Sequence, residues 1–149
     1  MLRPPILIAE DDADDRFLLQ TAFVENGYTD TIDFVENGVD VMNYLRDLNK
    51  PENLDPGGGL KAAYPSFILL DLNMPKKNGR EVLKEIKEHP DLKKIPVIIF
   101  TTTKNELEIN RCYELGANSY IVKPSSFELL LKIINQIRNY WLMTSAIPV

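Results

Sequence analysis

The amino-acid sequence predicts an α/β fold in which a five-stranded parallel sheet carries helices on both faces. Five short apolar runs alternate along the chain with five stretches in which apolar residues recur at helical spacing. Such alternation gives parallel strands joined by right-handed helical crossovers. Three of the runs are continuously apolar, which is typical of strands buried on both faces. With 149 residues, the chain has the size of one domain with a substantial core.

The predicted strands and helices follow each other in strict order. Strands are expected at residues 6–9, 31–35, 67–70, 97–100 and 120–122, and helices at 16–26, 39–48, 80–88, 105–115 and 127–141. Gly27 and Gly116 are placed to end the first and fourth helices, because glycine is favoured just beyond a helix C-terminus. Together the elements predict a doubly wound, three-layer sandwich of the flavodoxin-like type, with strand order 2-1-3-4-5.

We interpret the whole chain, 1–149, as a single domain with a core at about 5–140. The segment 49–65 is rich in proline and glycine and is expected to form a long, mobile loop. The apolar tail at 141–149 has two interpretations. It packs back on the domain, or it completes a dimer contact together with the fourth and fifth helices.

Composition and charge restrict the possible partners and the location. The chain has 17 basic and 22 acidic residues, a formal net charge of −5 and a pI near 4.9. This balance argues against general binding to nucleic acid and against a polybasic membrane patch. Cys112 is the only cysteine, so no internal disulfide can form, and a reducing cytoplasm is the simplest location. No apolar run approaches the roughly 20 residues of a membrane span.

Carboxylates follow two of the predicted strands. Asp71 ends the third apolar run, and Glu10 and Asp11 follow the first. One interpretation is that Asp11 or Asp12 caps the next helix, but capping does not explain Asp71. Clustered carboxylates repel one another unless a cation neutralises them, and oxygen ligands at an open site suit Mg²⁺. The acids therefore predict a magnesium site at the carboxyl edge of the sheet, where ligands of such sheets bind.

A hydroxyl and a cation follow the last two strands. Thr101 ends the fourth run and Lys123 ends the fifth, just before Pro124. Each alone is more often a capping threonine or a solvated lysine. Beside Asp71, however, a hydroxyl and an ammonium could bind the oxygens of a transferred phosphoryl group. The combination predicts that Asp71 is a nucleophile that accepts a phosphoryl group.

This pattern resembles the receiver domains of bacterial two-component response regulators. The resemblance covers roughly residues 5–140 and rests on four segments: Ile8-Ala9-Glu10-Asp11-Asp12, Leu69-Leu70-Asp71-Leu72-Asn73-Met74-Pro75-Lys76-Lys77-Asn78-Gly79, Ile95-Pro96-Val97-Ile98-Ile99-Phe100-Thr101 and Tyr120-Ile121-Val122-Lys123-Pro124. The segments Lys76-Lys77-Asn78-Gly79-Arg80-Glu81-Val82-Leu83 and Tyr140-Trp141-Leu142 further resemble the stand-alone regulators of phytochrome-type histidine kinases.

The resemblance implies a role for each site residue. Asp71 would be the phosphoacceptor, and Mg²⁺ would be bound directly by Asp11, Asp71 and the backbone carbonyl of Asn73. Glu10 would reach the metal through a water molecule; many members of the family have Asp at this position.

The remaining roles concern the phosphoryl group and the switch. Thr101 and Lys123 would bind phosphoryl oxygens. Tyr120 would be the switch residue that turns inward after phosphorylation, and the Lys123–Pro124 peptide bond is expected to be cis.

These roles describe a signalling switch. A sensor histidine kinase would phosphorylate Asp71 in a Mg²⁺-dependent reaction, and slow hydrolysis would reset the protein. Phosphorylation would alter protein contacts at the surface of the fourth helix, fifth strand and fifth helix, where a homodimer is also expected. The alternative is a Mg²⁺-dependent phosphatase of the haloacid-dehalogenase type. Such enzymes carry a second Asp as general acid where this chain has Asn73, and their nucleophile usually follows the first strand. A third alternative is an adaptor that binds partners without phosphate.

Overall fold

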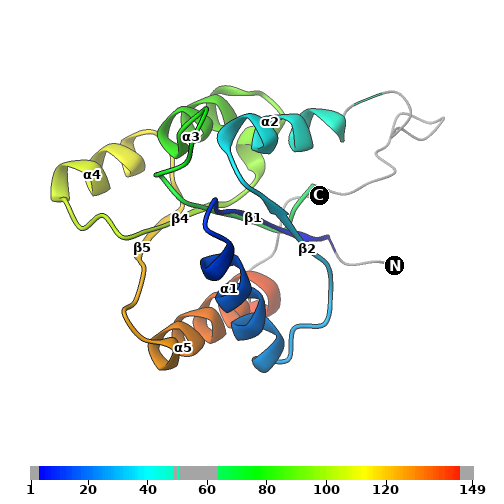
Figure 1. The fold of residues 1–149 in the computed structure, drawn as a ribbon. Helices are drawn as coiled ribbons and strands as arrows, with labels where there is room; N and C mark the ends of the chain where they lie inside the picture. The colour runs from blue at the N-terminus through cyan, green and yellow to red at the C-terminus, as the bar shows by residue number, and fades with distance from the viewer. Residues whose placement is uncertain (1–3, 49, 51–63, 145–149) are drawn as a thin grey trace.

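The computed structural model, which describes residues 4–48, 50 and 64–144, confirms the predicted fold class. Five parallel strands form one sheet in the order β2-β1-β3-β4-β5 (Figure 1). Their bounds are Ile6–Ala9 for β1, Ile32–Val35 for β2, Ile68–Leu70 for β3, Val97–Thr101 for β4 and Ser119–Val122 for β5. The strands predicted from the apolar runs therefore all form, with ends that differ by one residue at most.

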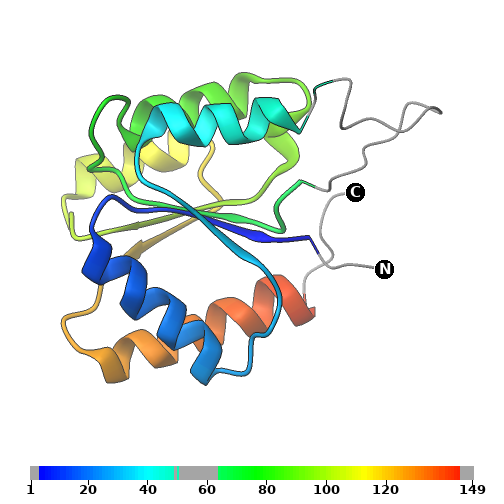
Figure 2. The same cartoon turned by 45° about the vertical axis from the view of Figure 1, so that its right-hand side comes forward.

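Helices cover both faces of the sheet (Figures 1 and 2). On one face lie α1 and α5, and on the other lie α2, α3 and α4. Their bounds are Ala13–Glu25 for α1, Gly38–Asp47 for α2, Gly79–Glu88 for α3, Glu106–Glu114 for α4 and Phe127–Ile137 for α5. A short 3-10 helix, Leu92–Lys94, was not predicted. Side chains at the helix N-termini fix several of these boundaries, because they accept backbone N–H groups that would otherwise lack partners.

Two predicted helix boundaries are wrong. The first helix begins at Ala13 rather than at residue 16, because the Asp12 carboxylate caps it by accepting the N–H of Asp15 at 2.9 Å. The last α-helix ends at Ile137, and the chain continues as a π-helix, Arg138–Thr144, rather than as one helix to residue 141.

The sheet separates two apolar cores. Successive side chains of a strand point to opposite faces, so Leu7 and Ala9 of β1 join the core under α2, α3 and α4, while Ile6 and Ile8 join the core under α1 and α5. Trp141 and Leu142 pack against the second core. This part of the apolar tail therefore packs back on the domain.

Other predictions concern single bonds and segments. No peptide bond among the described residues is cis, so the cis Lys123–Pro124 bond expected from the resemblance is not found. The trans form of an X-Pro bond is ordinarily favoured by about 0.5–1 kcal/mol. The segment 49–65 and the tail lie largely outside the described residues, which leaves the single-domain assignment as a prediction. No helix within the described part of the chain is long and apolar enough to cross a membrane.

Gly79 brings the start of α3 against the loop that follows β3. Its N–H donates to the Leu72 carbonyl at 3.0 Å, and a Cβ at this position would lie 2.3 Å from the Asp71 carbonyl oxygen. We expect Gly79→Ala to lower the free energy of unfolding by about 1–3 kcal/mol, because backbone atoms must move to accept the methyl group. Urea denaturation measures this change. Lys84→Ala, on the exposed side of the same helix, should change stability by less than about 0.5 kcal/mol, and equal effects of the two would contradict the packing argument.

Candidate functional site

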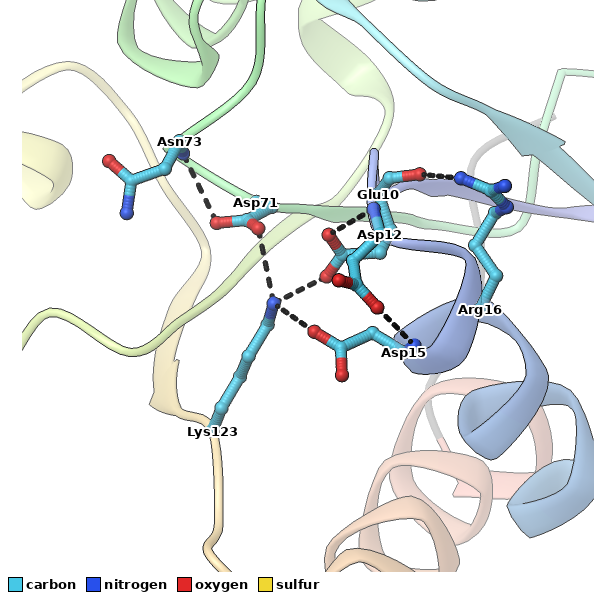
Figure 3. Close-up of polar contacts among 7 residues, drawn as sticks. All are labelled: Glu10, Asp12, Asp15, Arg16, Asp71, Asn73 and Lys123. Atoms are coloured by element: carbon cyan, nitrogen blue, oxygen red, sulfur yellow. Dashed lines mark hydrogen bonds and ion pairs between the residues drawn. The ribbon is translucent and has the colours of Figure 1, made fainter.

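Asp71 lies immediately after β3, at the carboxyl edge of the sheet. Its N–H donates to the Ala9 carbonyl at 3.1 Å, which continues the β1–β3 ladder by one residue. The residue is only 6% exposed. Its Oδ1 accepts the N–H of Asn73 at 3.1 Å, and its Oδ2 lies 3.1 Å from Lys123 Nζ (Figure 3). The backbone therefore holds a nearly buried carboxylate in a fixed direction.

Two further acids come from the end of β1. Glu10 is 2% exposed, and its Oε2 accepts the N–H of Asp12 at 3.2 Å. Asp11 is exposed to solvent. Carboxylate oxygens of Glu10, Asp11 and Asp71 all lie within 4.8 Å of one another. The strand-end argument thus predicted the convergence of these three residues.

Lys123 neutralises part of this negative charge. It follows β5, and its N–H donates to the Thr101 carbonyl at 2.8 Å. Its ammonium forms ion pairs with the carboxylates of Glu10, Asp71 and Asp15 (Figure 3). The side chain is 13% exposed. Lys123 is therefore the cation that joins the ends of β1, β3 and β5.

Burial and charge shift the pKa values of Glu10 and Lys123 in different ways. Burial raises the pKa of Glu10 to about 7, against the opposing effect of the hydrogen bond from Lys123. Burial alone would lower the pKa of Lys123, but the hydrogen bonds and charges of Glu10 and Asp71 outweigh it and raise that pKa. Lys123 therefore stays positively charged at neutral pH, where the acids need it.

The three carboxylates fit a divalent cation. All the donors are oxygens, which hard cations such as Mg²⁺ and Mn²⁺ prefer. One of the three side chains is exposed, so water could complete the coordination shell. Lys123 supplies one positive charge to several acids, so a further cation would reduce the remaining repulsion.

Thr101 and Tyr120 lie on neighbouring strands beside this site. Thr101 is fully buried, and its Oγ1 is the one buried side-chain polar atom of the described residues without a hydrogen-bond partner. Burial raises the pKa of Tyr120 to about 12, so its hydroxyl stays protonated and donates to the Thr103 carbonyl at 2.8 Å. The hydroxyl of Tyr120 is thus tied to the segment that follows Thr101.

Two residues of the site were missed from the sequence. Asp15 contacts Lys123, and Arg16 Nη1 donates to the Glu10 carbonyl at 2.9 Å while Nη2 forms an ion pair with Glu36 at 3.0 Å. Both lie on the first turns of α1, which the sequence analysis began too late. A helix started after the capping residue Asp12 would have placed Asp15 and Arg16 in its first turn, close to the acids that follow β1.

His89, the only histidine of the chain, has a local structural role. Its Nδ1 accepts the N–H groups of Asp91 and Leu92, at 3.1 and 3.2 Å. It therefore caps the 3-10 helix that follows α3.

Comparisons with known proteins agree with this geometry. A family model described as the response regulator receiver domain matches residues 6–135. The response regulator Rcp1 of Synechocystis is 38% identical over 147 residues, which cover 97% of this chain and 95% of Rcp1. A probable methanogenesis regulatory protein of Methanothrix harundinacea, FilR2, is also 38% identical, over 137 residues that cover 92% of this chain and 83% of FilR2.

Solved structures show the same similarity over the whole fold. The phosphorylated cyanobacterial phytochrome response regulator RcpA has a TM-score of 0.85 at 38% identity, with 99% of each chain covered. The Mn²⁺-bound form of Rcp1 has a TM-score of 0.83 at 36% identity, with 99% of this chain and all of that chain covered.

This chain belongs to the receiver domains of response regulators. Proteins of this class are phosphoacceptor switches of two-component signalling rather than turnover enzymes, so the phosphatase alternative is not supported. Among the relatives, the response regulator Rcp1 and the phytochrome response regulator RcpA match nearly the full length of this chain.

Lys123→Met would test the charge balance of the site. Without the ammonium, the buried carboxylates lose their partner, and we expect the free energy of unfolding to fall by about 1–3 kcal/mol. Mg²⁺ or Mn²⁺ should then raise the melting temperature more in this variant than in the wild type, because the metal binds only the folded site. Lys132→Met, on the exposed side of α5, is the control. A metal-independent melting temperature in both the wild type and Lys123→Met would contradict the divalent site.

Proposed function

We propose that Asp71 accepts a phosphoryl group from the phosphohistidine of a phytochrome-type histidine kinase, with Mg²⁺ as the metal. The observation that carries the proposal is the position of the Asp71 carboxylate. It is held between the Asn73 N–H and the Lys123 ammonium, within a cluster of three carboxylates that fits a divalent cation. A nucleophilic carboxylate, a metal site and a fixed cation are the parts that phosphoryl transfer requires.

In the proposed transfer, an oxygen of Asp71 forms a bond to phosphorus as the bond between phosphorus and the donor imidazole nitrogen breaks. The imidazole leaves with the electron pair and is neutral if its other ring nitrogen carries a proton. Lys123 binds an oxygen of the transferred group and reduces its charge. Asp11, Asp71 and the backbone carbonyl of Asn73 would hold Mg²⁺, with Glu10 contributing through water. When bound, the metal supplies positive charge next to the phosphoryl oxygens.

Thr101 and Tyr120 are proposed to link phosphorylation of Asp71 to a structural change at the surface. The Thr101 hydroxyl has no partner in the described structure, and an unsatisfied buried hydroxyl carries a penalty of about 1–3 kcal/mol. A phosphoryl oxygen on Asp71 would give it an acceptor. Movement of Thr101 toward that oxygen would shift the segment up to Thr103, whose carbonyl holds the Tyr120 hydroxyl. Tyr120 would then turn inward, and the surface of α4, β5 and α5 would change.

The similarity to RcpA, a cyanobacterial phytochrome response regulator that matches 99% of this chain, supports a phytochrome-type kinase as the partner. FilR2 is equally identical over a slightly shorter alignment. Cys112 is buried and free, which fits action in the reducing cytoplasm.

Asp71→Asn should abolish phosphorylation. Incubation with acetyl phosphate and Mg²⁺ is expected to add one phosphoryl mass to the wild-type protein, as measured by intact mass spectrometry. The adduct should be labile to base. It should be absent without Mg²⁺ and absent in Asp71→Asn, whose amide is a poor nucleophile. Asp91→Asn, an exposed residue distant in sequence from the site, is the control and should be phosphorylated like the wild type.

Two outcomes would favour the alternatives, and a separate experiment tests the partner. Rapid, repeated hydrolysis of small phosphate esters would favour a phosphatase, and no adduct under any condition would favour an adaptor. Phosphotransfer from a purified phytochrome-type kinase, compared with an unrelated histidine kinase at equal concentration, tests the partner. Equal rates from both kinases would contradict the phytochrome assignment.

We also propose a homodimer through the surface of α4, β5 and α5 with the adjoining C-terminal segment. Large apolar side chains are exposed there, with Leu107 80%, Tyr113 47%, Tyr140 55% and Met143 64% exposed. In the proposed dimer these side chains would be covered, which would remove their apolar surface from water.

Leu107→Glu should convert the dimer to a monomer in sedimentation equilibrium, because a charge would be placed in the apolar contact. Val24→Glu makes a comparable apolar-to-acid change at a 59% exposed position of α1 and should leave the dimer intact. A wild-type protein that is monomeric at all concentrations, both with and without phosphorylation, would contradict the proposed dimer.

A further inference from the structure

Asp15 is a carboxylate contact of Lys123 that the proposed chemistry does not use. Its Oδ2 lies 3.2 Å from Lys123 Nζ. The other two acids on this ammonium, Glu10 and Asp71, are nearly buried, whereas the Asp15 side chain is 41% exposed. Lys123 therefore lies between two acids of the site and one acid at the surface of α1 (Figure 3).

The three contacts occupy all the hydrogen-bond donors of the Lys123 ammonium. A protonated lysine has three N–H donors, and each can be assigned to one carboxylate. An arriving phosphoryl group must therefore take a donor from an existing partner. It also approaches a region where Asp15 adds negative charge, which repels the anionic phosphodonor.

Of the two partners other than Asp71, Asp15 can leave Lys123 more easily. Separating the buried Glu10 from Lys123 would leave a buried charge without its partner, which is strongly unfavourable. Exposed ion pairs contribute little. Asp15 and Lys123 also line a cavity of about 120 Å³ whose walls include Leu18, Phe100 and Phe127, so both side chains have space to separate.

We propose that Asp15 competes with the phosphoryl group for Lys123 and thereby slows phosphorylation of Asp71. Asp15 is a positioning residue in this account, since it acts through Lys123 and does not contact Asp71. The inference rests on the proposed function of Asp71. Asp15 would then limit the rate at which Asp71 is phosphorylated.

Asp15→Asn tests the competition, because the amide keeps an oxygen that can accept from Lys123 but removes the charge. The initial rate of phosphorylation is measured by intact mass over a series of acetyl phosphate concentrations with Mg²⁺. We expect the slope of rate against phosphodonor concentration to rise about two- to fivefold, the range that corresponds to an exposed ion pair. The increase should shrink at high ionic strength, which screens exposed charges.

Asp14→Asn is the matched control. Asp14 is exposed, lies in the same first turn of α1, and its side chain has no hydrogen bond or ion pair with any residue in the described part of the chain. Asp14→Asn and Asp15→Asn each remove one negative charge from the N-terminal end of α1. Effects on the stability of the helix therefore cancel when the two variants are compared. The slope of Asp14→Asn should stay close to that of the wild type. Asp15→Glu keeps the charge and should be phosphorylated about as slowly as the wild type.

The outcomes distinguish this inference from the proposed function. Equal slopes for Asp15→Asn and Asp14→Asn, or a slower reaction in Asp15→Asn, would overturn the competition while leaving the phosphoacceptor role of Asp71 in place. If the wild type takes up no phosphoryl group at all, the proposed function fails and the inference falls with it. A change only in the urea midpoint, with unchanged slopes, would identify Asp15 as a merely structural residue.

Discussion

The ion pairs of Lys123 with Glu10 and Asp71 are the interaction on which the site depends. Two nearly buried carboxylates at adjacent strand ends would repel each other strongly in a low dielectric, and Lys123 is the side chain that allows both to stay there. The same ammonium is placed to receive a phosphoryl oxygen. The Lys123 ammonium therefore stabilises the unphosphorylated site and also supplies positive charge for the phosphoryl group. The arrangement explains why a fold would keep charged side chains where apolar ones would pack more favourably.

The scaffold brings these groups together at the carboxyl ends of nearby strands. The acids follow β1 and β3, which are neighbours in the sheet, and Lys123 follows β5, two strands from β3. The Lys123 side chain is long enough to cross the end of β4, the strand between β3 and β5. Thr101 lies buried at that end. The unpartnered Thr101 hydroxyl thus lies on the strand between the cation and the nucleophile. Backbone hydrogen bonds of Asp71 and Lys123 to neighbouring strands fix both ends of this arrangement.

The sequence could predict the sheet and the strand-end residues because both follow from short-range patterns. Continuous apolar runs mark buried parallel strands, and the residue after each run must lie at the carboxyl edge. Contacts set by helix geometry were harder to predict. Asp15 and Arg16 were missed because the first helix was started at its apolar spacing, at residue 16, although Asp12 was considered as a cap and does accept the N–H of Asp15. The change from α-helix to π-helix after Ile137 and the trans Lys123–Pro124 bond have no distinctive signal in residue type.

The contact of Tyr120 with Thr103 shows how a change at a buried site can reach the surface over a short path. Thr101 ends β4, and Thr103 follows two residues later in the segment that leads to α4. Its carbonyl accepts from Tyr120 on β5, while the Tyr120 N–H donates to the hydroxyl of Tyr113 on α4. The segment, the strand and the helix are therefore joined through one tyrosine. If a displacement of Thr101 carries Thr103 with it, as we propose, the hydrogen bond from the Tyr120 hydroxyl must lengthen or move. One short path of contacts therefore connects the segment after Thr101 with the surface formed by α4 and β5.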